Sequence, residues 1–155
     1  MSKWRKLRGL SRPERLLLVQ AAVALPAVAV LIRVKGLGPC QRLLARLTPA
    51  LKKSAAEADG SAESHARAVG RIVTAAAAHG PYRANCLQRS VVIWWLLRRR
   101  GLEGELRIGA RKEGGRLDAH AWVEFSGRAL NESRDVGARF AVFERPVNSP
   151  GARSG

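Results

Sequence analysis

The stretch that decides the fold is NCLQRSVVIWWLLRRRG, residues 85–101. Its apolar side chains cover nearly every side of a helix, a pattern typical of a helix buried at the centre of a domain. The arginines of residues 98–100 suit the negative end of the helix macrodipole, and Gly101 is a common terminator. The sequence therefore predicts a central helix over residues 86–100, with Cys86 in its first turn.

Cys86 stands where a thiol nucleophile would be expected. The start of a helix presents unpaired N–H groups and the positive end of the macrodipole, which stabilise the reactive thiolate form of cysteine. The other cysteine, Cys40, is interpreted as an ordinary buried apolar residue. With no C-x-x-C spacing and no Cys/His cluster, we expect neither a metal site nor a disulfide framework, and a reduced, cytoplasmic protein fits best.

After Gly101 the apolar residues recur with a period of two, which predicts strands over residues 105–111 and 117–125. On the second strand the apolar side chains at odd-numbered positions share one face. The other face carries Asp118, His120, Trp122 and Glu124. His120 therefore lies on the less apolar face, where it could meet Cys86 as a general base.

The turn after this strand sets the next register. A two-residue loop of Ser126-Gly127 suits neither a type I′ nor a type II′ turn well, whereas a three-residue loop over residues 125–127 places glycine at the left-handed position. The three-residue loop is therefore preferred. It pairs Glu124 with Arg128.

This choice selects a third catalytic candidate. Counting outward from the preferred loop sets His120 opposite Glu132, whose carboxylate could orient the imidazole. The two-residue register would put Asn131 on that face instead, and an amide can play the same role. Glu132 is the preferred candidate, with Asn131 and Asp118 as alternatives.

The N-terminal half is predicted to be helical. Ser11 and Glu14 form a capping signature ahead of an apolar run over residues 16–32. This run is shorter than the roughly 20 apolar residues of a spanning helix and contains Pro26, so a buried or membrane-surface helix fits better. Basic residues on both sides would suit contact with anionic lipid. Further helices are predicted over residues 42–53, after a turn at residues 36–39, and over residues 61–79.

The chain is strongly basic, with 28 Lys and Arg against 12 Asp and Glu, a formal net charge of +16. This charge makes acidic peptides, anionic lipids and nucleic acid plausible partners. Only 5% of residues are aromatic and none interleave with basic residues as a base-stacking surface would, so we expect no nucleic-acid partner. No P-loop or glycine-rich phosphate cradle occurs, and we expect no cofactor.

The second half of the chain resembles the leader peptidases of lasso peptide biosynthesis, which are transglutaminase-like cysteine proteases, in their standalone form without a leader-recognition domain. The resemblance covers most of residues 60–143. It rests on four stretches, NCLQRS at residues 85–90, WWLLRRRG at 94–101, LRIG at 106–109, and AHAWVE at 119–124 with LNE at 130–132.

The resemblance implies a Cys-His-acid site, in which Cys86 is the nucleophile, His120 the general base and then acid, and Glu132 the third member. The family usually has Asp at this third position, and Glu reaches one methylene further. The implied reaction is hydrolysis that removes the leader peptide from a ribosomally made precursor.

Partners also follow from the resemblance. It implies the precursor peptide, a separate leader-recognition protein of winged-helix type and the lasso cyclase that acts next. Transglutaminase-like acyl transfer and a non-catalytic basic adaptor are the alternatives. Peripheral membrane contact is a further alternative for the N-terminal helices.

The expected architecture is an α+β fold of the transglutaminase-like or papain-like kind. N-terminal helices and the cysteine-bearing helix pack on a small antiparallel sheet, completed by strands over residues 128–131 and 139–143. We divide the chain into a partner- or membrane-contacting helical region at residues 1–57, a catalytic core at 58–145 and a disordered tail at 146–155.

Overall fold

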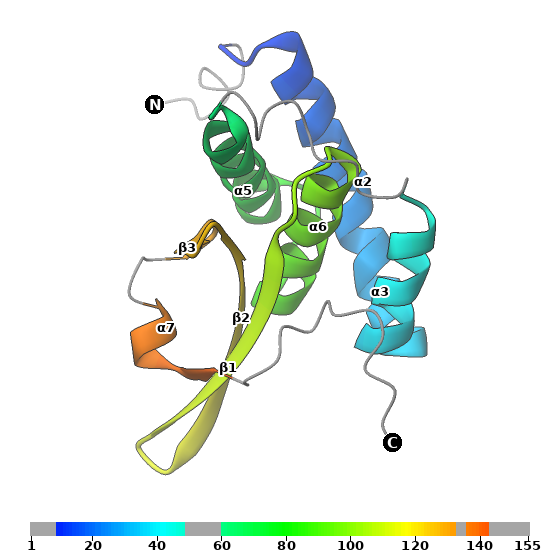
Figure 1. The fold of residues 1–155 in the computed structure, drawn as a ribbon. Coiled ribbons are helices and arrows are strands. Elements are labelled where there is room, and N and C mark those ends of the chain that lie inside the picture. Colours follow the sequence, from blue (N-terminus) through cyan, green and yellow to red (C-terminus); the bar gives the residue numbers. More distant parts are fainter. Residues whose placement is uncertain (1–8, 49–59, 133–135, 143–155) are drawn as a thin grey trace.

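The computed structural model describes residues 9–48, 60–132 and 136–142. In these ranges the long helices of the chain pack against one side of a small sheet (Figure 1). The elements are α2 (Arg12–Lys35), α3 (Leu37–Arg46), α5 (Ala62–His79), α6 (Cys86–Arg99), β1 (Glu105–Glu113), β2 (Arg116–Phe125), β3 (Arg128–Ala129), α7 (Val136–Arg139) and β4 (Ala141–Val142). The predicted α+β class is confirmed.

Helix α6 lies between the other long helices and the sheet, as predicted for a helix that is apolar nearly all round (Figure 1). Asn85 caps its start: the Asn85 side chain accepts from the backbone N–H of Gln88, and the Gln88 side chain accepts from the backbone N–H of Asn85. Reciprocal capping satisfies two N–H groups that the helix cannot pair internally. Cys86 is thereby fixed as the first helical residue.

Helix α2 begins at the predicted cap, where Ser11 and Glu14 form a capping box, and continues through Pro26 to Lys35. It is longer than the predicted apolar run because the basic residues at both ends are also helical. One face of α2 joins α3, α5, α6 and the inner face of the sheet in a single hydrophobic core. The predicted boundary at residues 57/58 and the tail at residues 146–155 lie outside the described residues.

Helix α3 begins earlier than predicted. The expected turn at residues 36–39 is the start of the helix: Gly36 occupies the cap with φ of 84°, and Pro39 lies in the first turn, where its missing N–H costs nothing. The helix ends at Arg46, and the predicted extension from residue 49 lies outside the described residues. The helix predicted over residues 61–79 is confirmed as α5.

The sheet has the order β3-β2-β1-β4 and its described pairings are antiparallel. Strands β1 and β2 form a long hairpin closed by Gly114-Gly115, in which Gly109 pairs with His120. The strand predicted over residues 139–143 is wrong at its start, because Arg139 ends α7 and β4 begins at Ala141. Strand β3 is also shorter than predicted and ends at Ala129.

The predicted three-residue loop after β2 is wrong. Phe125 pairs with Arg128, which leaves a two-residue loop in which Ser126 and Gly127 have φ of 50° and 74°. Two left-handed residues are the signature of a type I′ turn, whose twist matches that of the strands it joins. The favourable twist of the hairpin therefore outweighs the conformational cost of positive φ at Ser126.

Candidate active site

His120 and Glu132 are in direct contact. The Nε2 atom of His120 lies 3.0 Å from Oε1 of Glu132, and both side chains are partly buried. The pairing does not arise from the predicted register, because the β2–β3 ladder ends at Ala129. Glu132 instead reaches His120 from the segment that follows β3.

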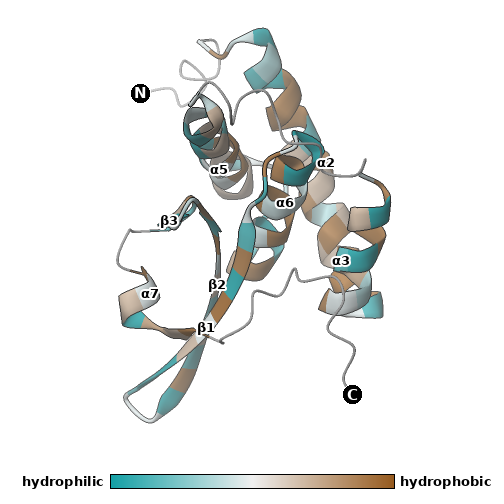
Figure 2. Cartoon of the chain, viewed as in Figure 1, coloured by the Kyte–Doolittle hydropathy of each residue, from teal (hydrophilic) through white to brown (hydrophobic). Residues whose placement is uncertain are grey.

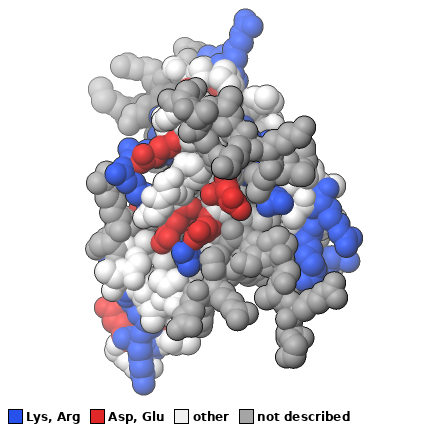
Figure 3. Space-filling model, viewed as in Figure 1, with Lys and Arg blue, Asp and Glu red and all other residues white. Residues whose placement is uncertain are grey.

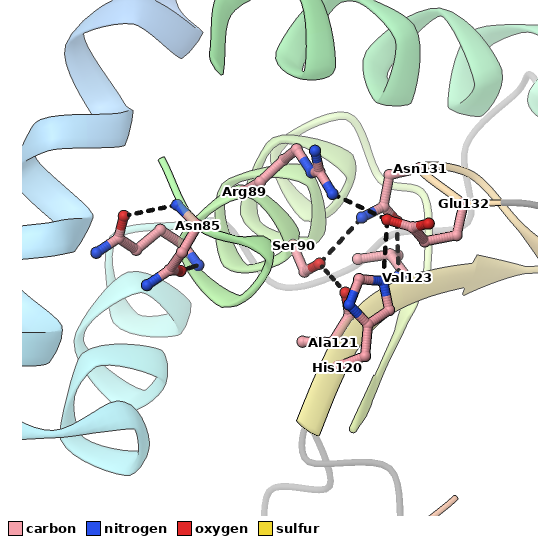
Figure 4. A network of polar contacts seen from close by, with 9 residues as sticks. Asn85, Arg89, Ser90, His120, Ala121, Val123, Asn131 and Glu132 are labelled. Carbon is pink, nitrogen blue, oxygen red and sulfur yellow. Dashed lines mark hydrogen bonds and ion pairs between the residues drawn. The ribbon is translucent and has the colours of Figure 1, made fainter. Parts of the chain in front are cut away.

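Arg89 supplies a second contact to Glu132 from helix α6. Its guanidinium NH2 lies 2.9 Å from the same Oε1 atom, and only 21% of the Arg89 side chain is exposed (Figure 4). The carboxylate is thus held between a helix and a strand. The role of Arg89 cannot be predicted from the sequence, since no local pattern links residues that are 43 positions apart.

Cys86 lies on the face of α6 that is turned toward this pair. Residues three and four positions later share a helix face with it, and these are Arg89 and Ser90. Arg89 binds Glu132, and the hydroxyl of Ser90 donates to the carbonyl of Ala121, the neighbour of His120. The Cys86 side chain is partly exposed, and in the described part of the chain no hydrogen bond joins it to His120. Since Glu132 engages Nε2, Nδ1 is the imidazole nitrogen left for the thiol.

Asn131 has a different set of partners. Its Oδ1 accepts from the backbone N–H of Val123 at 2.9 Å, and its Nδ2 donates to Ser90 Oγ at 3.1 Å (Figure 4). The side chain therefore takes the place of a strand partner for β2 and links β2 to α6. Asp118 is paired with Arg111 at 3.1 Å on the far part of the hairpin. Of the three candidates, Glu132 is the one in contact with His120.

The His120 face of β2 is covered more than the sequence indicated. The ring of Phe140 stacks on the imidazole with centroids 5.2 Å apart, and Trp122 is fully buried. Trp122, Val136 and Phe140 form a second, small apolar cluster. Val136 and Phe140 are four residues apart, a spacing typical of one face of a helix. This spacing is the sequence signal from which a helix covering the His120 side of β2 could have been predicted.

Close packing between α5 and the segment after β3 also positions the site. A Cβ atom added to Gly70 would lie 2.8 Å from the backbone oxygen of Leu130, so glycine allows this segment to approach α5. Asn131 and Glu132 follow directly. This glycine is a second positioning feature that the sequence pattern did not reveal.

The site combines a cysteine in the first turn of a buried helix, on the helix face that Arg89 and Ser90 share, with a histidine paired to a carboxylate. These are the groups that cysteine-dependent acyl chemistry needs. Within the described ranges, no group of three His, Cys, Asp or Glu side chains is arranged to hold a metal ion. The model of the transglutaminase-like superfamily matches residues 21–145, and the chain belongs to this superfamily. Its members are commonly cysteine-dependent enzymes and include cysteine proteases and acyl transferases. No curated protein and no solved structure matches the chain.

Proposed function

We propose that this protein is a cysteine protease that removes the leader peptide from a lasso peptide precursor, assisted by a separate leader-binding protein. The observation that carries the proposal is the contact of His120 Nε2 with Glu132 beside the helix that begins at Cys86. The resemblance in residues 85–101 and 119–132 supplies the substrate class. Membership of the transglutaminase-like superfamily supports the thiol chemistry.

In the proposed reaction, Nδ1 of His120 takes the proton from the Cys86 thiol, and the thiolate sulfur attacks the scissile carbonyl carbon. Collapse of the tetrahedral intermediate breaks the C–N bond, and the imidazolium gives its proton to the leaving amine. Water, deprotonated by His120, then hydrolyses the thioester and restores the thiol. Glu132 accepts from Nε2–H throughout, which fixes the tautomer and stabilises the imidazolium.

The helix start offers groups for the oxyanion. The N–H of Gln88 is used by the cap, and the N–H of Arg89 donates to the carbonyl of Asn85. The N–H groups of Cys86 and Leu87 have no acceptor among the described residues, as expected for the first two positions of a helix. Donors already oriented at the nucleophile are suited to stabilise developing negative charge.

The test is mass spectrometry of a precursor peptide encoded beside this protein, incubated with the chain and the neighbouring leader-binding protein. Cys86→Ala removes the nucleophile, and Cys40→Ala is a matched control at the buried cysteine. We expect fragments whose summed mass exceeds the precursor by one water, absent with Cys86→Ala and present with Cys40→Ala.

Other outcomes contradict the proposal. A product that has lost ammonia would assign acyl transfer in place of hydrolysis. The peptide could also remain intact with every variant, while its binding to the protein falls steeply with salt and is unchanged by Cys86→Ala. That result would identify the protein as a non-catalytic basic adaptor.

A further inference from the structure

Helix α2 exposes a stripe of large aliphatic side chains along its whole length. These residues are between 59% and 72% exposed and comprise Leu16, Val19, Val23, Val30 and Val34. Their spacing places them on one side of a helix with 3.6 residues per turn. Figure 2 shows the apolar character of this helix. A soluble surface rarely carries so continuous an apolar strip without a partner.

Helix α3 widens this apolar surface. Leu43 and Leu47 are 40% and 64% exposed and lie four residues apart. Between α2, α3 and the end of α6 is a groove of about 470 Å³ with largely apolar walls, to which α6 contributes Trp95 and Arg99. We call the exposed parts of α2 and α3 together the α2–α3 face.

Among the described residues, the charged side chains of α2 and α3 are mostly basic. Glu14 is the single acidic residue in α2 and α3, and it is already bound to Ser11 and Arg71. The basic residues of the two helices are Arg12, Arg15, Arg33, Lys35, Arg42 and Arg46. Basic side chains gather at the margin where Figure 1 places α3 (Figure 3). The surface that fits this face is therefore apolar within and anionic at its boundary.

Two other occupants fit less well. Among the described residues α2 is the helix long and apolar enough to cross a membrane, with a mean hydropathy of 2.2 over its best window. Its opposite face, however, carries Leu17, Ala21 and Leu25 into the core, and a spanning helix would have to give up that packing. A second copy of the chain would bring together two molecules of net charge +16.

We propose that the α2–α3 face binds an anionic membrane surface, with α2 lying parallel to it. Amphipathic helices bind in this way, with aliphatic residues among the acyl chains and Lys or Arg at the headgroups. Helix α6 separates this face from the sheet, so the site of His120 and Glu132 is turned away from the bilayer (Figure 1). A soluble peptide could reach it in the bound state.

Flotation of the full chain with lipid vesicles tests this proposal. Wild type is compared on phosphatidylcholine vesicles and on vesicles that also contain phosphatidylglycerol. The test variant is Val23→Asp with Val30→Asp, both at exposed positions, and Val34→Ser is a milder second variant. Leu117→Asp is the matched control, because Leu117 is 76% exposed on β2, away from the α2–α3 face. Circular dichroism checks that each variant is folded.

We expect binding to the anionic vesicles alone, about tenfold or more weaker in the double variant and unchanged with Leu117→Asp. Failure of wild type to float with anionic vesicles would overturn the proposal whatever the variants do. If vesicle binding weakened with salt but was the same for the wild-type chain and the α2 double variant, the chain would adsorb to the vesicles through its charge alone, and the proposal would be wrong. If the double variant still bound vesicles but no longer dimerised or no longer bound the leader-binding protein, the α2–α3 face would be a protein-binding surface and the proposal would be wrong.

Discussion

Arg89 and His120 bind the same oxygen of Glu132, at 2.9 and 3.0 Å. One donor comes from helix α6 and the other from strand β2, so the carboxylate bridges the two elements that carry the proposed nucleophile and base. All three side chains are 24% exposed or less. The guanidinium restricts the carboxylate to an orientation in which it faces the imidazole.

Replacement of Glu132 should slow catalysis, and more so when the hydrogen-bond acceptor is removed than when only its charge is removed. Glu132→Gln keeps an oxygen acceptor for Nε2–H but loses the charge, and we expect kcat/KM for leader cleavage to fall about tenfold. Glu132→Ala leaves the imidazole unoriented, and we expect a loss of about 10²- to 10⁴-fold. Steady-state cleavage kinetics measure both. An unchanged rate with Glu132→Ala would remove Glu132 from the site.

Arg89 should act through Glu132 and not on the substrate. We expect Arg89→Gln to lower kcat about tenfold with little change in KM, because the carboxylate loses a charge-assisted hydrogen bond worth about 1.5–3 kcal/mol. Arg89→Lys should recover part of the rate, since it restores the charge without the planar fork. A purely structural role would instead lower thermal stability and active fraction while kcat per folded molecule stayed the same.

The two cysteines should differ in reactivity. Cys86 is partly exposed, whereas Cys40 is fully buried, and burial raises the pKa of the Cys40 thiol. A raised pKa leaves less of the reactive thiolate at any given pH, and burial also blocks access. Near neutral pH we expect iodoacetamide to add one group to the folded chain, at Cys86, and two groups after unfolding. Peptide mapping would contradict this if Cys40 reacted at a similar rate in the folded protein.

Periodicity was sufficient for the elements that carry most of the site. Strong helical or alternating patterns located α5, α6, β1 and β2, and Ser11 was found from its capping signature. What failed depended on tertiary context. The conformation of Ser126 is set by the twist of the hairpin. Helix α7 forms where Val136 and Phe140 pack on Trp122.

Glu132 shows how a correct neighbour can follow from a wrong register. The register predicted from the sequence sets Glu132 opposite His120, on the assumption that the β2–β3 ladder continues without interruption. In the structure this ladder ends at Ala129. The side chain of Asn131 then takes the backbone N–H of Val123, and the chain turns away from the strand direction. No local pattern encodes this substitution of a side chain for a backbone acceptor. The contact with Arg89 likewise required the position of α6 over the sheet.

Asn131 should stabilise the fold without taking part in catalysis. Asn131→Ala leaves the N–H of Val123 and the hydroxyl of Ser90 without a shared partner, and we expect a loss of about 1–3 kcal/mol in the free energy of unfolding. Because both residues belong to one network, Ser90→Ala combined with it should cost less than the sum of the single changes. Urea denaturation measures these values. Strict additivity would show that the two side chains do not act together.

Gly70→Ala should disturb the site from the opposite side of the segment after β3. The added Cβ atom would lie 2.8 Å from the carbonyl oxygen of Leu130, and backbone must move to make room. We expect about 1–3 kcal/mol of destabilisation and a lower kcat, because Glu132 lies two residues further along. Gly137→Ala is the matched control: nothing lies within 4 Å of its added Cβ atom, so stability should stay equal or rise by up to about 1 kcal/mol. Denaturation and cleavage rates are measured on both variants. If Gly70→Ala kept the wild-type kcat, the approach of this segment to α5 would not position Glu132.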